Sequence, residues 1–126
     1  YILRSNGEMV ECTYSAIKEY KLTECEDPAP YSDPRAGEEG KPVTFPDAQF
    51  IQMKMTAAPD SSLYLLDTHS TGIYHFSLQR NLQKIYQPGF NDPEYSPQEM
   101  ATSMALSPGK TLFLGFGSEI FTSKLP

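Results

Sequence analysis

Two stretches of the chain repeat one another at a spacing of forty-nine residues. Residues 55–65 read MTAAPDSSLYL and residues 104–114 read MALSPGKTLFL, so that a methionine, a proline and a leucine–aromatic–leucine triplet stay in step. Each stretch continues through a short polar turn into a second apolar run, at residues 73–78 and 120–125. Short apolar runs bounded by turn residues are typical of antiparallel strands. A repeat of about 40 to 50 residues therefore predicts that the chain folds the same small β-sheet more than once.

The clearest copy of this unit lies in residues 49–87. Four runs rich in β-forming residues follow one another there, each ended by Pro, Gly, Asp or Ser: residues 50–56, 63–66, 73–78 and 81–86. Such an order favours four sequential antiparallel strands, a meander.

Incomplete copies flank this unit. Residues 1–23 contain two strand-like runs, 8–15 and 17–22, and are expected to end one sheet, with Asn6 and Gly7 as a turn before them. Residues 100–126 are expected to form most of another sheet. Residues 24–48 are acidic and rich in proline, and 88–99 combine Gly, Pro and Asp, so both segments are predicted to be loops, the first long and mobile.

Residues 63–78, LYLLDTHSTGIYHFSL, resemble a blade of the β-propeller superfamily, and residues 105–114 are similar to the opening of such blades. The resemblance, clearest in residues 55–78 and 104–125, is shared by WD40-type, NHL-type and YWTD-type repeats. The Gly-His and Trp-Asp dipeptides of WD40 repeats are missing, and the chain has no Trp. The resemblance implies an all-β fold of antiparallel four-stranded meander blades, a partial β-propeller of about two to three blades.

A propeller of two to three blades would be incomplete, because closure takes about 4 to 8 blades. Unclosed sheets leave edges that invite pairing. We therefore expect this chain to be a piece of a larger propeller, or to be completed by a partner chain.

Composition limits the partners. The net charge is −6 and the ten basic residues are scattered, whereas a nucleic-acid partner needs clustered Lys and Arg. No apolar stretch reaches the roughly 18 residues of a membrane span. Cys12 and Cys25 do not form a disulfide framework, so we expect two reduced thiols in an intracellular protein, in the cytoplasm or nucleus, with a disulfide as the alternative.

The sequence offers no complete catalytic set. Asp67, His69 and His75 lack the spacing of a zinc site, and there is no Gly-x-Ser-x-Gly elbow. We expect no enzyme activity, no cofactor and no metal site. Asp67 is predicted to hydrogen-bond its own turn, and His75 to face away from its neighbours Tyr74 and Phe76.

The predicted loops supply the candidate contact residues, since an aromatic ring among Pro, Asp and Gly has no obvious core to enter and exposed aromatics anchor interfaces. The candidates for protein interaction are Tyr31, Arg35, Phe90 and Tyr95. The sequence thus favours a non-catalytic scaffold that binds protein partners within a larger assembly. The alternatives are the accessory propeller of an enzyme, such as a hydrolase, whose catalytic residues lie outside this segment, and an extracellular receptor propeller, which a Cys12–Cys25 disulfide would support.

Overall fold

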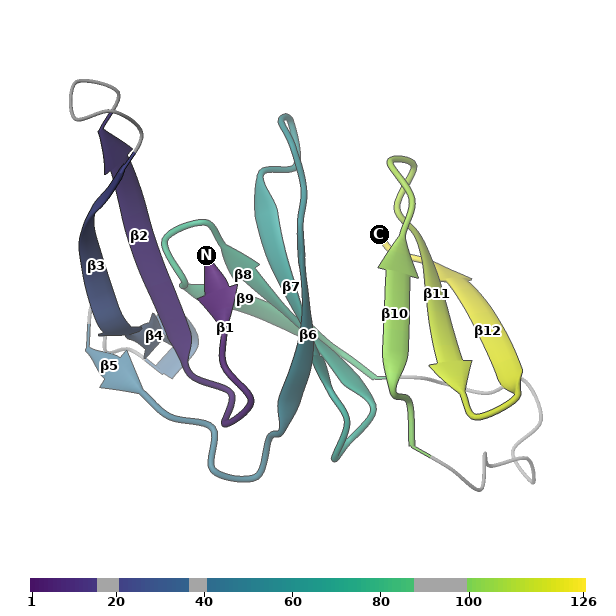
Figure 1. Cartoon of the computed structure of the whole chain (residues 1–126). Coiled ribbons are helices and arrows are strands. Elements are labelled where there is room, and N and C mark those ends of the chain that lie inside the picture. Colours follow the sequence, from purple (N-terminus) through teal and green to yellow (C-terminus); the bar gives the residue numbers. More distant parts are fainter. Residues whose placement is uncertain (16–20, 37–40, 88–99) are drawn as a thin grey trace.

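The computed structural model describes residues 1–15, 21–36, 41–87 and 100–126, and these fold into antiparallel β-sheets with one short 3-10 helix (Figure 1). Strands that follow one another in the chain pair with one another, giving an N-terminal sheet, a central sheet and a C-terminal sheet, plus a two-stranded ribbon. The predicted all-β, antiparallel class is confirmed.

The N-terminal sheet has the order β1 (Ile2–Leu3), β2 (Met9–Ser15) and β3 (Lys21–Ala29). The turn expected at Asn6 and Gly7 joins β1 to β2. Gly7 has a φ of 86°, a conformation that glycine adopts without steric cost. The Asn6 side-chain oxygen accepts a hydrogen bond from the Glu8 backbone N–H at 3.1 Å, which closes the turn.

The predicted loop begins later than residue 24. β3 runs through Ala29, which lies opposite Met9 of β2. Its acidic residues Glu24 and Glu26 are exposed while Ala29 is buried. Strand pairing, rather than an apolar pattern of its own, therefore holds this segment in the sheet. The strand predicted over residues 17–22 lies mostly outside the described residues.

The remainder of the acidic, proline-rich segment contains short elements. They are β4 (Tyr31–Ser32), the 3-10 helix η2 (Pro34–Ala36) and β5 (Pro42–Val43). β4 pairs with β5, and the Ser32 backbone N–H donates to the carbonyl oxygen of Arg80 at 3.0 Å. The segment is thereby attached to the edge of the central sheet.

The central sheet contains the four predicted strands in the predicted order. They are β6 (Phe50–Met55), β7 (Ser62–Asp67), β8 (Gly72–Ser77) and β9 (Leu82–Tyr86). Every residue of β7 is buried, because both faces of this sheet are covered by neighbours. The loop predicted for residues 88–99 lies outside the described residues.

The C-terminal sheet repeats the register of the central sheet. It consists of β10 (Ser103–Leu106), β11 (Thr111–Phe116) and β12 (Glu119–Lys124). In each sheet the middle strand places one leucine between a methionine of the first strand and an aromatic residue of the third. The two sets are Met53–Leu65–Tyr74 and Met104–Leu114–Phe121.

The methionines that the sequence brings into step are not equivalent in the structure. The connection between the first two strands covers residues 56–61 in the central sheet but only 107–110 in the C-terminal sheet, two fewer. The partner of Met104 in the repeat is therefore Met53, not Met55. The two prolines lie within these turns. Aligning them in the sequence therefore ignores the difference in turn length and displaces the first strands by two residues.

Two apolar clusters lie on either side of the central sheet. Leu63 and Leu65 point to the cluster shared with the N-terminal sheet, and Tyr64 and Leu66 point to the cluster shared with the C-terminal sheet. This is the alternation of a strand that is buried on both faces. The three sheets are thus packed face to face in a row.

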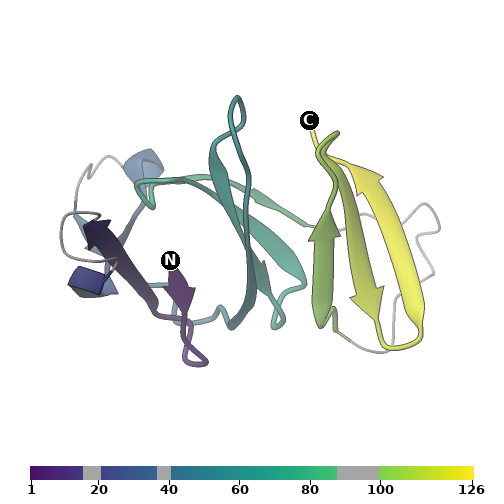
Figure 2. The same cartoon turned by 45° about the horizontal axis from the view of Figure 1, so that its top comes forward.

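The first strands of the three sheets, β1, β6 and β10, are neighbours in space, because β6 contacts both of the others (Figures 1 and 2). The Gln52 side chain of β6 joins the edge of β10. Its Nε2 donates to the Met104 carbonyl oxygen and its Oε1 accepts from the Met104 N–H, both at 2.8 Å. A side-chain amide thereby replaces the backbone pairing that the two strand edges lack.

Candidate functional site

Tyr31, predicted as an exposed contact residue, is part of the core. Its side chain lies in the cluster between the N-terminal and central sheets, and the residue is only 8% exposed. The hydroxyl donates to the Gly7 carbonyl oxygen at 2.8 Å, and the ring packs edge-on against Phe45 and Phe50. Burial raises the pKa of Tyr31. The expectation that the Tyr31 ring is exposed is wrong, because the proline-rich segment folds back onto the central sheet and gives the ring a core to enter.

Arg35 is exposed, as a contact residue must be, but its guanidinium already has a partner. Nε and one terminal nitrogen donate to the two carboxylate oxygens of Asp33 at 2.9 and 3.1 Å. These hydrogen bonds lower the pKa of Asp33. A protein partner that binds Arg35 would have to compete with Asp33. The other two candidates, Phe90 and Tyr95, lie outside the described residues.

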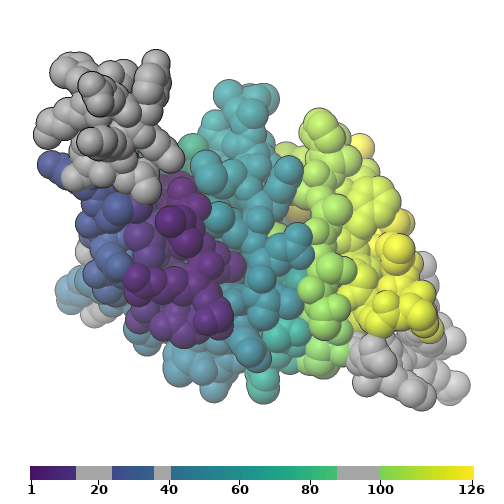
Figure 3. All heavy atoms as spheres, viewed as in Figure 1, coloured from purple at the N-terminus to yellow at the C-terminus, as the bar shows by residue number. Residues whose placement is uncertain are grey.

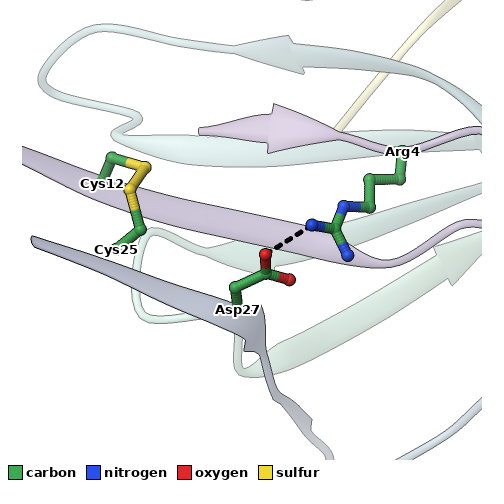
Figure 4. The surroundings of a disulfide bond; sticks show 4 residues. All are labelled: Arg4, Cys12, Cys25 and Asp27. Carbon is green, nitrogen blue, oxygen red and sulfur yellow. Dashed lines mark hydrogen bonds and ion pairs between the residues drawn. A yellow bond between two sulfur atoms is a disulfide. The ribbon is translucent and has the colours of Figure 1, made fainter. Parts of the chain in front are cut away.

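Cys12 and Cys25 form a disulfide, which corrects the expectation of two reduced thiols (Figure 4). They lie directly opposite one another on β2 and β3, with their Cα atoms 4.1 Å apart. The spacing in the sequence does not reveal this, since only the register of the β2–β3 hairpin makes the two residues partners. Disulfides are rare in the cytosol and nucleus. The intracellular expectation therefore loses the support that reduced thiols would give it.

We expect native protein to resist alkylation at both cysteines until it is reduced. Unfolding in denaturant with iodoacetamide but without reductant should leave Cys12 and Cys25 unmodified, because neither sulfur is a free thiolate. Mass spectrometry of the peptides checks this, and reduction before alkylation is the control. Modification of either cysteine without reductant would show that the disulfide is absent from the native protein.

Arg80 joins the central sheet to the N-terminal sheet. It lies in the turn between β8 and β9 and is 9% exposed. Its Nε donates to the Pro30 carbonyl oxygen at 2.9 Å, and its terminal nitrogens form ion pairs with Glu26, at 3.2 Å, and with Glu11. One guanidinium thereby fixes β2, β3 and the β8–β9 turn relative to one another. Nothing in the sequence distinguishes this arginine from an ordinary exposed turn residue.

Asp60 joins the central sheet to the C-terminal sheet. One carboxylate oxygen accepts hydrogen bonds from the Thr56 hydroxyl at 2.7 Å and the Tyr64 hydroxyl at 3.0 Å, and the other pairs with Lys110 at 3.1 Å. Burial opposes the ionisation of Asp60, but these three interactions outweigh it and lower its pKa. Lys110 lies in the turn between β10 and β11, so the ion pair spans the boundary between the two sheets.

A serine and a histidine lie in contact next to this ion pair. His75 Nε2 is 2.8 Å from the Ser62 hydroxyl oxygen, and the imidazole stacks on the Tyr64 ring at 4.6 Å. His75 thus faces the C-terminal sheet, whereas Tyr74 and Phe76 pack toward the N-terminal sheet, as the alternation predicts.

The Ser62–His75 pair lacks the features of a catalytic relay. A relay needs a third group that orients the histidine and a serine that a substrate can reach. His75 Nδ1 is buried without a hydrogen-bond partner, and Ser62 is buried with its hydroxyl donating to the Asp60 carbonyl oxygen at 3.0 Å. Asp67 hydrogen-bonds its own turn, as predicted. Among the described residues, no three acidic, histidine or cysteine side chains are grouped as metal ligands.

The protein should lose stability as the pH falls from 7 toward 5, with His75 as the cause. Burial lowers the pKa of His75 from 6.5; Asp60 opposes this shift, and Lys110 and Lys84 add to it. The unfolded chain therefore binds a proton near pH 6.5 that the folded chain resists, since a proton on Nδ1 would find no acceptor. The stability that neutral His75 contributes is complete above pH 6.5 and is lost below it, by less than about 1.4 kcal/mol per pH unit.

Urea unfolding at a series of pH values measures this dependence. His75→Gln, which keeps a polar side chain that does not titrate, should flatten the profile between pH 7 and 5. His69→Gln is the matched control and should retain the slope. Equal slopes for wild type and His75→Gln would assign the pH dependence to other groups.

Most of the large apolar side chains that are exposed among the described residues lie on the sheets; the exception is Met100, which precedes β10. Ile2 of β1, with Ile51 and Met55 of β6, is exposed along the first strands. Phe113 and Ile120 are exposed on the C-terminal sheet, the latter at 73%. The sequence carried a signal for the last two, because they occupy repeat positions whose counterparts are apolar.

No helix among the described residues is long and apolar enough to cross a membrane. Comparison of the chain with protein-family models, with curated proteins and with solved structures finds no match in any of the three.

Proposed function

We propose that this chain is a segment of a β-propeller that acts as a non-catalytic scaffold for protein–protein contact within a larger assembly. One observation carries the proposal: the central and C-terminal sheets repeat one register, and the first strand of the central sheet, β6, lies beside both β10 and β1. Propeller blades are meanders of this kind, placed side by side around an axis with their first strands innermost.

The contacts between the sheets support a scaffold role. Arg80 bridges the first boundary, and the Asp60–Lys110 pair and Gln52 bridge the second. Each is a specific polar contact added to an apolar interface, so the sheets are held in a fixed relation. When the sheets are held in a fixed arrangement, a partner can bind without the sheets having to move, which lowers the entropic cost of binding.

Sedimentation velocity of the oxidised 126-residue chain tests this proposal. Three sheets are fewer than the roughly four that closure requires, so open strand edges should cause association. We expect concentration-dependent species larger than one chain, and crosslinks from Lys110 or Lys124 to a second polypeptide in native extracts. A monodisperse, cooperatively unfolding monomer without such crosslinks would contradict the proposal and favour a small, self-sufficient β-fold.

The Cys12–Cys25 disulfide favours a second candidate, an extracellular receptor propeller. Disulfides form and persist in secreted proteins and on cell surfaces. Under this candidate the scaffold works in an oxidising compartment. Fractionation of the source cells decides between the two, since a native pool confined to the cytosol, with both thiols reactive, would exclude the extracellular role.

A further inference from the structure

We propose that the outer face of the C-terminal sheet is the docking surface for one further meander β-sheet, a deduction that rests on the proposed function. The outer face is the side turned away from the central sheet. Its residues, which are all exposed or half-exposed, are Ser103, Ala105, Thr111, Phe113, Gly115, Ile120, Thr122 and Lys124.

The repeat identifies this face as a surface built for burial. In the shared register, Phe113 takes the place of Tyr64, and Ile120 the place of Ile73. Tyr64 and Ile73 are each 1% exposed because the C-terminal sheet covers them, whereas Phe113 and Ile120 are 38% and 73% exposed. The chain thus keeps large apolar side chains at positions that its own central sheet buries.

The remaining residues of the outer face suit close contact with another sheet. Ala105 and Gly115 carry little or no side chain, and the Ser103 hydroxyl lies over Gly115, where a Cβ would come within 2.3 Å of it. Lys124, at the end of β12, is the only charged residue of the face. A nearly uncharged face with two apolar side chains matches the buried part of an interface.

The inner face of the same sheet shows what the partner must present. Met104, Leu112 and Leu114 lie in one apolar cluster with Tyr64 and Ile73 of the central sheet. The occupant that we assign is therefore a β-sheet with aliphatic residues alternating along its facing strands. It would extend the row of face-to-face sheets beyond its C-terminal member (Figure 3), continuing the two interfaces already present in the chain.

A second copy docked head to tail fits less well. It would present the free face of the N-terminal sheet. Glu11 and Glu26 point to the other face, toward Arg80, so the neighbouring residues Cys12 and Cys25 place their disulfide on the free face. The exposed ion pair Arg4–Asp27 lies beside this disulfide (Figure 4). Covering that pair with Ile120 would bury charges against an aliphatic surface, which is unfavourable.

An extended chain provides the probe. Residues 88–126 are repeated after Pro126, so that a second C-terminal sheet, with its aliphatic inner face, follows the first through its native connection. We expect hydrogen exchange of the β12 amides in the first copy to slow by about tenfold relative to the 126-residue chain. Ile120→Asp in the first copy should abolish this protection. Ser123→Asp, an exposed neighbour on the other side of β12, is the matched control and should preserve it.

Three results would overturn the inference: no protection in the extended chain, equal effects of Ile120→Asp and Ser123→Asp, or a dimer of the 126-residue chain that Ile120→Asp dissociates. The last would identify a second copy as the occupant. Failure here is distinguishable from failure of the proposed function, because the original chain could still associate through the first strands β1 and β6.

Discussion

Replacing Ile73 with alanine should lower the free energy of unfolding by about 2 to 4 kcal/mol, whereas the same replacement at Ile120 should change it by less than about 0.5 kcal/mol. Both residues are isoleucines at one position of the repeat, so the change in chemistry is identical. Ile73 lies in the cluster between the central and C-terminal sheets and would leave a cavity there. Ile120 is exposed and would leave none.

Equilibrium unfolding in urea, followed by circular dichroism, measures both values. Far-ultraviolet spectra of the two variants should match that of the wild-type chain, which shows that each variant is folded before its stability is compared. Equal losses at Ile73 and Ile120 would mean that Ile120 is buried in solution, by self-association or otherwise. The measurement is therefore made at several protein concentrations, since burial by self-association depends on concentration.

The sequence predicted the strands where the alternation is strong and the turn residues are clear. The four strands of the central sheet and the turn at Asn6 and Gly7 follow from local chemistry alone. The structural equivalence of Met104 and Met53 did not follow from the sequence, because a two-residue difference in turn length shifts the first strand without altering any motif. A sequence alignment matches identical residues such as proline, whereas the equivalent positions of two sheets are set by the register of their paired strands.

The contacts between distant segments were beyond the sequence. Glu24 to Ala29 look like a loop, and become a strand only because β2 lies beside them. The disulfide and the burial of Tyr31 follow from that pairing and from the return of the chain onto the central sheet. Arg80 and Asp60 have the residue types of exposed turns, and only the packing of one sheet on the next makes them bridges.

Replacing Asp67 with alanine should cost on the order of 3 kcal/mol of unfolding free energy, a large effect for a single carboxylate. Asp67 is 1% exposed, and its two oxygens accept four hydrogen bonds. The donors are the backbone N–H groups of Gln49, at 2.7 Å, His69, at 2.9 Å, and Ser70, at 3.3 Å, together with the Ser70 hydroxyl. Alanine would leave these donors without their acceptor at a site that water reaches poorly.

Asp67→Asn separates shape from charge, because the amide keeps the volume but turns one acceptor into a donor that faces other donors. The free energy of unfolding of Asp67→Asn should therefore lie between those of the wild-type chain and Asp67→Ala. Asp33→Ala is the matched control. Asp33 also accepts a hydrogen bond from a backbone N–H two residues ahead, that of Arg35, at 3.0 Å. Because the ion pair between Asp33 and Arg35 lies at the surface, removing the carboxylate should cost less than about 1 kcal/mol of unfolding free energy. Urea unfolding of the three variants gives the order, and a loss at Asp67 no greater than that at Asp33 would show that the turn does not need the carboxylate. Through the Gln49 N–H, Asp67 also holds the start of β6, the strand that contacts both β1 and β10, so we expect part of the loss to come from the contacts between the sheets.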